Sequence, residues 1–207
     1  MGRVIAVSNQ KGGVGKTTTA VNLSACLAND GNRTLLIDLD PQANATSGCE
    51  AGVDNLEGSV YEVLLGHAPL EGVICSAGIS GLDLAPSHIS LAGAEVEMSS
   101  VLGREKRLAE ALETVRPDYD FIIVDCPPSL GLLTVNALTA ADSVLIPVQC
   151  EYYALEGLSK LLNSIQLVQR YLNPTLEIEG VLLTMYDERL QLSKRVAAEV
   201  KSYFHDK

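Results

Sequence analysis

The chain has 207 residues, of which 47% are hydrophobic and 20% charged, and its formal net charge is −11 at pH 7. Such a composition is typical of a folded chain that buries a core, and it argues against a disordered tail. No run of about 18 uncharged apolar residues occurs, so no membrane-spanning helix is predicted. The acidic balance disfavours nucleic-acid binding through the whole surface, whereas a local basic patch stays compatible with it.

The cysteines argue against two further classes of protein. There are five, an odd number, spread widely and never in C-x-x-C spacing. This pattern disfavours a disulfide framework and a zinc finger. The first residues lead into a polar loop without the long apolar segment of a signal peptide. We therefore expect a location in the reducing cytoplasm.

Strands and helices are predicted to alternate along the chain. In order, the expected elements are strand 4–8, helix 17–27, strand 34–37, helix 60–65, strand 82–85, helices 91–98 and 105–115, strands 121–124 and 144–148, helix 155–172, strand 178–185 and helix 190–203. Continuous apolar runs such as 121–124 are typical of parallel strands covered on both faces. The predicted fold class is α/β, a mostly parallel twisted sheet flanked by helices on both faces, as one domain over residues 1–207.

A phosphate-binding loop is predicted between the first strand and the first helix, where residues 11–18 read KGGVGKTT. Backbone N–H groups and a helix N-terminus converge on an anion at such a place, and glycine lets the main chain approach phosphate closely. Lys16 can reach the β- and γ-phosphates, and the Thr17 hydroxyl can bind Mg²⁺. The expected nucleotide-binding residues are Lys11, Gly12, Gly13, Val14, Gly15, Lys16, Thr17 and Thr18. The match to G-x-x-x-x-G-K-[ST] is loose, because Gln10 replaces the first glycine, and a glycine-rich turn without a ligand is the alternative.

Aspartates follow two later strands. Asp38 and Asp40 come after strand 34–37, and Asp125 comes after strand 121–124. The carboxyl ends of strands face the ligand crevice of an open α/β sheet. Asp125 fits a Walker-B carboxylate that holds a Mg²⁺-bound water. Of Asp38 and Asp40, one could support the Mg²⁺ shell and the other orient an attacking water, unless both only shape a solvated turn.

Three segments carry a resemblance to a known family. They read NQKGGVGKTTT at residues 9–19, DLDPQ at 38–42 and DCPPSLG at 125–131. The sequence resembles the ParA/Soj/MinD ATPases, P-loop NTPases of the SIMIBI type with a deviant Walker-A loop. Segments 87–95 and 147–158 look like the chromosomal ParA (Soj) branch. The resemblance implies ATP or ADP and Mg²⁺ as ligands.

The resemblance also implies residue roles. Lys11 matches the signature lysine that reaches the partner's nucleotide in a dimer, as an arginine finger does. Asp40 matches the switch aspartate that positions the hydrolytic water. The predicted catalytic residues are therefore Lys11, Lys16 and Asp40, and the predicted metal ligands are Thr17, Asp38 and Asp125.

The family cycle implies three partners: a second copy in an ATP-dependent homodimer, non-specific double-stranded DNA, and a ParB/Spo0J-type protein that stimulates hydrolysis. A nucleoid-associated cytoplasmic location without membrane binding follows. Arg189 resembles a DNA-facing arginine, and Lys194, Arg195 and Lys201 are its basic neighbours. An ordinary solvated residue at a helix start is the alternative for Arg189.

Members of this branch continue beyond residue 207, so we expect a C-terminally shortened domain; if that end is natural, strand 178–185 or its neighbour would present an unpaired edge. Two other functions stay open. A membrane-positioning ATPase like MinD would need a basic amphipathic C-terminal helix. A shortened nucleotide-binding interaction module would have an impaired DNA-binding cycle. A metal–sulfur cluster carrier of the Mrp type is disfavoured, because no paired cysteines occur.

Overall fold

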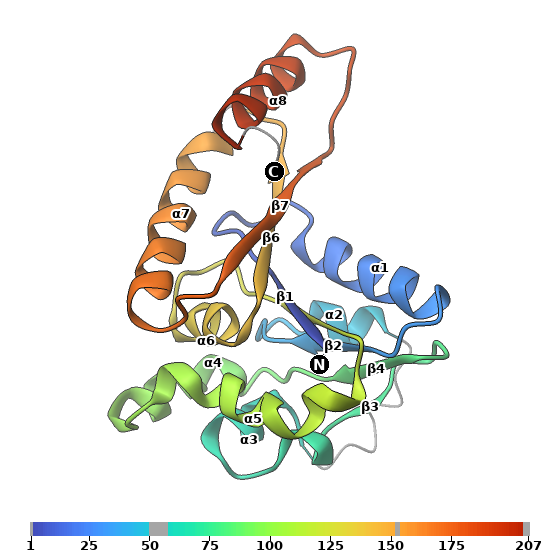
Figure 1. Cartoon of the computed structure of the whole chain (residues 1–207), viewed down its shortest axis with the longest axis vertical. Coiled ribbons are helices and arrows are strands. Elements are labelled where there is room, and N and C mark those ends of the chain that lie inside the picture. The colour runs from blue at the N-terminus through green and yellow to red at the C-terminus, as the bar shows by residue number, and fades with distance from the viewer. Residues whose placement is uncertain (1, 50–57, 152–153, 205–207) are drawn as a thin grey trace.

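One seven-stranded sheet organises the chain (Figure 1). The computed structural model describes residues 2–49, 58–151 and 154–204. The strands are β1 (Arg3–Val7), β2 (Thr34–Asp38), β3 (Cys75–Ser76), β4 (Leu82–Ala85), β5 (Phe121–Asp125), β6 (Ser143–Gln149) and β7 (Glu177–Thr184). Their order is β3-β4-β2-β5-β1-β6-β7, and every neighbouring pair is parallel except β3 with β4.

Helices connect the strands and cover both faces of the sheet. They are α1 (Lys16–Asn29), α2 (Asn44–Gly48), α3 (Val60–Leu65), α4 (Leu91–Glu97), α5 (Arg107–Val115), α6 (Leu132–Ala140), α7 (Ala154–Tyr171) and α8 (Gln191–Phe204). Short 3-10 turns lie at Leu70–Gly72, Met98–Ser100, Arg104–Lys106 and Arg116–Asp118. Figure 1 shows α1 on one side of β1 and β6, and α6 and α7 on the other.

Alternating side chains of the strands divide the core into two parts. On β1, Ile5 and Val7 pack in the cluster that contains residues of α1 and α2. Val4 and Ala6 join the larger cluster that contains residues of α3 to α8. Because successive side chains of a strand point to opposite faces, a central strand that is apolar throughout is stable only when both faces are covered.

This architecture confirms the predicted fold class. Three elements were not predicted: α2, β3 and α6. Nearly all residues of α6 are buried. Its sequence therefore lacks the amphipathic pattern, apolar on one side and polar on the other, by which a surface helix is recognised. Among the described residues, no helix combines the length and apolar character needed to cross a membrane.

β7 forms one edge of the sheet in the described part of the chain. Its pairing with β6 contains an irregularity after Val144, where the register shifts by one residue. The side chains of β7 are half-buried at best, and Leu182 is exposed.

Candidate nucleotide-binding site

The sheet brings the predicted strand-end residues together. Val7, the last residue of β1, pairs with Asp125 of β5, and Asp38 of β2 pairs with Asp125 from the other side. Three loops that are distant in sequence therefore leave the same edge of the sheet from adjacent strands. In parallel sheets, ligands bind at this carboxyl edge.

The loop between β1 and α1 leaves its main chain open to solvent. Gly13 and Gly15 have φ of 76° and 90°, a left-handed conformation that favours glycine. Side chains added at Gly12 or Gly13 would meet nothing within 4 Å. No side chain caps the first turn of α1. Its N–H groups are thus available to an anion, and the helix dipole favours negative charge there.

Elements from the second half of the chain hold this loop in place. The Asn9 side chain donates to the Pro147 carbonyl of β6 at 2.7 Å and accepts from the Lys11 N–H at 3.1 Å. The Thr184 hydroxyl, at the end of β7, donates to the Val14 carbonyl at 2.8 Å. Val14 itself is buried. The loop is therefore fixed at both ends while its glycines stay open.

A cavity of about 350 Å³ lies over the glycines. It is lined by Gly12, Gly13, Gly15, Lys16, Thr17, Thr18, Asp40, Gln42, Asn44, Pro128 and Met185. The structure thus brings most of the predicted phosphate loop together with Asp40. Sequence reasoning missed Gln42, Asn44 and Met185 as lining residues. Met185 follows a strand end, so the rule that identified Asp38 and Asp125 would have pointed to it.

The two lysines of the loop are held differently. The Lys16 ammonium is buried and donates to the Lys11 carbonyl at 3.0 Å. Burial lowers the pKa of Lys16, and the nearby Asp125 opposes that shift. The Lys11 ammonium forms an ion pair with Glu151, which follows β6. In this structure Lys11 is therefore neutralised within its own chain.

Asp125 is a buried carboxylate without a partner. Its side chain is fully buried, and neither oxygen has a close hydrogen-bond partner among the described residues, although the Thr17 hydroxyl is near enough to lower its pKa. Burial raises the pKa of Asp125 to about 7; the Asp38 and Asp40 charges add to the rise, and Thr17 and Lys16 oppose it. A buried charge without a partner is costly, so Asp125 would be stabilised by a cation.

Asp38 and Asp40 are bound into the local structure. Asp38 Oδ1 accepts from the Asp40 N–H at 3.0 Å, and Oδ2 accepts from the Thr46 N–H at 2.8 Å and the Thr46 hydroxyl at 2.7 Å. Burial raises the pKa of Asp38, and the Thr46 hydrogen bonds are the main opposing effect. Asp40 Oδ1 accepts from the Gln42 N–H at 3.0 Å. Asp40 faces the cavity, whereas Asp38 lies behind it.

The donor set fits a hydrated Mg²⁺ bound to phosphates. Among the described residues, no three His, Cys, Asp or Glu side chains are grouped so as to hold a metal ion alone. Mg²⁺ usually keeps several waters and takes few protein ligands beside substrate phosphates. Thr17 on the cavity wall and the unpartnered Asp125 suit that mode. A carboxylate offers about four acceptor positions, and in Asp38 three are occupied, which leaves one for a metal-bound water.

The predicted DNA-contacting residues lie on the surface. Arg189 is exposed, but its guanidinium forms a two-point ion pair with Asp187, with contacts of 2.9 and 2.7 Å. Lys194, Arg195 and Lys201 are exposed on α8. The structure thus places Lys194, Arg195 and Lys201 on the exposed side of α8, whereas Arg189 is paired with an acidic residue.

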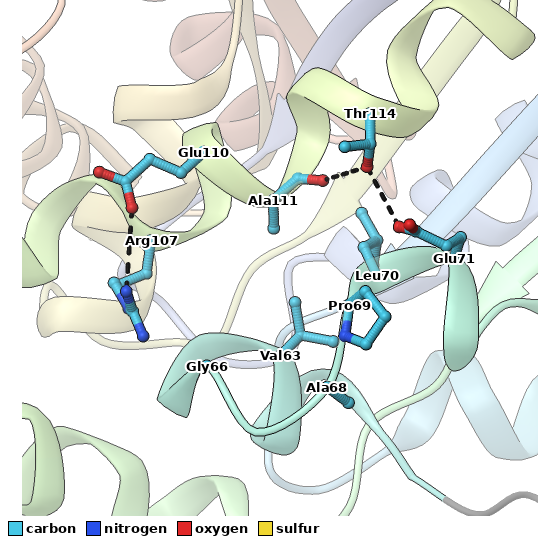
Figure 2. A pocket seen from close by; sticks show the side chains of 10 residues that line it. All are labelled: Val63, Gly66, Ala68, Pro69, Leu70, Glu71, Arg107, Glu110, Ala111 and Thr114. Carbon is cyan, nitrogen blue, oxygen red and sulfur yellow. Dashed lines mark hydrogen bonds and ion pairs between the residues drawn. The ribbon is translucent and has the colours of Figure 1, made fainter.

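A second hollow, between α3 and α5, lacks the features of a reactive site (Figure 2). Its charged side chains are already engaged. Arg107 donates to the Leu64 carbonyl at 2.9 Å and lies 3.9 Å from Glu110. Glu71 accepts from the Thr114 hydroxyl at 3.1 Å. The glycine-lined cavity is therefore the better candidate for a functional site.

A parallel sheet, a glycine loop that opens a helix and a buried aspartate on the neighbouring strand define the class of P-loop nucleotide-binding proteins. Comparison with known proteins specifies the class further. Residues 2–178 match the protein family described as "AAA domain". The chain is 59% identical over 207 residues to the sporulation initiation inhibitor protein Soj of Bacillus subtilis, covering all of this chain and 82% of that protein.

Two further relatives agree in sequence and fold. The chromosome partitioning protein ParA of Myxococcus xanthus is 55% identical over 204 residues, which are 99% of this chain and 72% of that protein. A crystal structure named cobyrinic acid a,c-diamide synthase from Mycobacterium smegmatis, with bound ATP analogue and magnesium, superposes with a TM-score of 0.90 at 44% identity, covering 98% of this chain and 82% of that one. The chain belongs to the ParA/Soj family of chromosome-partitioning ATPases.

Proposed function

We propose that the protein is a slow, Mg²⁺-dependent ATPase that dimerises when it binds ATP and acts as a switch in chromosome or plasmid segregation. The observation that mainly supports this proposal is the cavity, which is lined by both the open glycine loop and Asp40. The buried Asp125 lies behind the residues of this loop. Relatives named for chromosome partitioning support the biological role. A related fold with bound ATP analogue and magnesium supports the choice of ligands.

The residues of the cavity divide the work of hydrolysis. Backbone N–H groups of residues 12–18 and the Lys16 ammonium bind the phosphates. Thr17 and Asp125 would hold Mg²⁺, with Asp38 behind them, and the metal would neutralise phosphate charge. Asp40 lies on the cavity wall, where its carboxylate orients the attacking water.

Lys11 acts in the dimer. In the present structure it pairs with Glu151 of its own chain. In the ATP-bound dimer it leaves Glu151 and reaches the partner's nucleotide, where it offsets the charge that develops during hydrolysis. A ParB/Spo0J-type protein accelerates this step. The ATP dimer binds double-stranded DNA non-specifically through Arg189, Lys194 and Arg195, which places the protein on the nucleoid in the cytoplasm.

The membrane-bound alternative gains no support from α8. The apolar side of this helix is buried in the protein: Val196, Val200 and Phe204 belong to the larger core cluster. Insertion into a lipid surface would require these side chains to leave the core. A DNA-bound rather than membrane-bound switch is therefore the stronger proposal.

Light scattering coupled to size exclusion tests the switch, with ATP and Mg²⁺, with ADP, and without nucleotide. We expect a dimer only with ATP. Lys16→Ala should abolish it, because the phosphates lose their buried cation. Asp40→Ala should bind ATP but not hydrolyse it, so the dimer persists.

Lys106→Ala and Asp118→Ala serve as controls, because both residues are exposed and neither lines the cavity. Both variants should behave as the unaltered protein. Wild-type ATP turnover in Asp40→Ala would refute the role given to Asp40. A monomer under every condition would refute the switch.

A further inference from the structure

Thr46 lies at the centre of a buried hydrogen-bond network behind the cavity. Its hydroxyl donates to Asp38 Oδ2 at 2.7 Å and accepts from the Ser87 N–H at 2.9 Å. The Ser87 hydroxyl in turn donates to the Asp40 carbonyl at 2.7 Å. The network thus joins α2 to the two loops that follow β2 and β4.

Both ends of the network meet at Asp40. Its N–H is held by Asp38 Oδ1 and its carbonyl by Ser87, so the peptide groups on both sides of the Asp40 side chain are fixed. Asp38, Thr46 and Ser87 are all buried. Buried hydrogen bonds of this kind rigidify the backbone, because an unpaired group there would lose its contact with water as well.

The loop that Thr46 anchors includes an unusual backbone conformation. Ala43 has φ of 52° and lies between Asp40 and α2. A residue with a side chain enters this left-handed region at a cost of about 1 kcal/mol or more. The bonds made by Thr46 and Asp38 help to keep the loop in this shape, together with the bond from the Ala43 N–H to the Asp40 carbonyl at 2.8 Å. Without them, we expect the loop to relax and Asp40 to move.

We propose that Thr46, through Asp38 and Ser87, is a positioning residue that fixes Asp40 for ATP hydrolysis. The inference rests on the proposed function, since it assigns the role of Asp40 to hydrolysis. Thr46 does not line the cavity. Its partners, Asp38 and Ser87, lie at the end of β2 and after β4, and neither belongs to the phosphate loop. Loss of its hydroxyl should therefore impair turnover and leave nucleotide binding largely intact.

The test compares Thr46→Val with Thr46→Ser. Valine keeps the shape of threonine and the backbone N–H bond to Asp38, but it removes the hydroxyl. We expect kcat for ATP hydrolysis to fall about ten- to hundredfold, the range for a buried bond to a charged group. The Kd for ADP should change less than about threefold. Serine should restore most of kcat.

Ser47→Ala is the matched control, because Ser47 is the next residue of α2 and is exposed, and its hydroxyl donates only to the Ala43 carbonyl, which keeps its bond from the Ser47 N–H. Its kcat should equal that of the unaltered protein. Thermal denaturation checks that each variant is folded. If Thr46→Val does not fold, Ser87→Ala replaces it, since that variant keeps the Ser87 N–H bond to Thr46 and loses only the bond to Asp40.

The outcomes separate this inference from the proposed function. If the unaltered protein hydrolyses ATP and both Thr46→Val and Ser87→Ala match its kcat, the positioning role is wrong and the proposed function stands. Equal losses in kcat and in ADP affinity would also overturn it, because they indicate general disruption of the site. If the unaltered protein neither binds nor hydrolyses ATP, the proposed function itself fails.

Discussion

Asp125 combines full burial with the absence of a close hydrogen-bond partner among the described residues. Folded proteins pair nearly all buried polar atoms, so an exception of this kind points to a ligand or a catalytic role. The same burial raises its pKa to about 7. The nucleotide-free protein therefore carries an unfavourable charge in its core whenever Asp125 is ionised.

This cost makes stability depend on pH. Between the ordinary pKa of 3.8 and about 7, the folded protein binds more protons at Asp125 than the unfolded chain does. The contribution of Asp125 to stability is therefore largest in acid and is lost as the pH rises through about 7. Asp125→Asn cannot ionise, so we expect its Tm to exceed that of the unaltered protein by several degrees at pH 8 and to be nearly equal at pH 4, without nucleotide. Calorimetry at both pH values measures this, and an equal gap at both would contradict it.

Glu151 holds the Lys11 ammonium in the single chain. If Lys11 must leave this partner to reach a second protomer, Glu151→Gln should make dimerisation easier. We expect half-maximal dimer formation at a severalfold lower ATP concentration, measured by light scattering. Glu199→Gln is the control, because Glu199 is exposed on α8. A higher ATP requirement in Glu151→Gln would show that Glu151 assists the dimer instead.

Part of the site followed from the sequence alone. Asp38 and Asp125 follow strands in the sequence, and the structure brings those strand ends to the same edge as the end of β1, because the strands are parallel. Thr46 and Ser87 were not anticipated. They are 41 positions apart, and they meet only because β4 pairs with β2. No local pattern marks such a contact. The Lys11–Glu151 pair was missed for the same reason.

Among the elements distant in sequence from the glycine loop, β7 bonds to it through a side chain. It is the edge strand, yet Thr184 at its end donates to the Val14 carbonyl of the glycine loop. The conformation of that loop therefore depends on a strand that lies far from it in sequence. Loss of this bond should weaken the binding of nucleotide phosphates by the glycine loop.

Thr184→Val tests this link. We expect a loss of about 1 kcal/mol in stability, the usual value for one hydrogen bond. We also expect ADP to bind several times more weakly, because the glycine loop loses one of its anchors. Thr175→Val is the control, since the Thr175 hydroxyl donates only to the Asn173 side chain in an exposed turn. Calorimetry gives both quantities; unchanged ADP binding in Thr184→Val would refute the coupling.

The strands were easier to predict than the helices that they carry. Continuous apolar runs identified β5 and β6, because both faces of the sheet are covered. The coverage of both faces also explains why α6 was not predicted. This helix is buried on nearly every side, so it lacks the polar face of a surface helix. α2 is short and starts from the left-handed Ala43, so tertiary contacts rather than local preference maintain it.

The whole molecule is acidic, with a net charge of −11, and this opposes binding to another polyanion. Any DNA surface must therefore be local. Arg189 is already paired with Asp187. Lys194 and Arg195 are exposed and adjacent on α8, and they are the better candidates for contacts with phosphates.

The salt dependence of DNA binding tests these candidates. Asp40→Ala supplies a persistent ATP dimer in which Lys194→Ala and Arg195→Ala are compared. Each lost phosphate contact should reduce the slope of log K against log salt by about 0.9. A dimer carries each change twice, so a larger reduction is expected. Arg189→Ala should have a smaller effect, and Lys106→Ala none. Slopes that do not change in Lys194→Ala and Arg195→Ala would exclude α8 as the DNA surface.

The course of α1 has a practical consequence. The helix starts at the glycine loop and carries Cys26 ten positions after Lys16, about 15 Å along its axis. Of the five thiols, Cys26 alone is exposed, whereas Cys75 is half-buried and the others are buried. The native chain therefore offers one preferred attachment point for a fluorophore, without added cysteines. A dye there would stay outside the cavity, on the same helix as Lys16. It would be close enough for energy transfer from a labelled nucleotide.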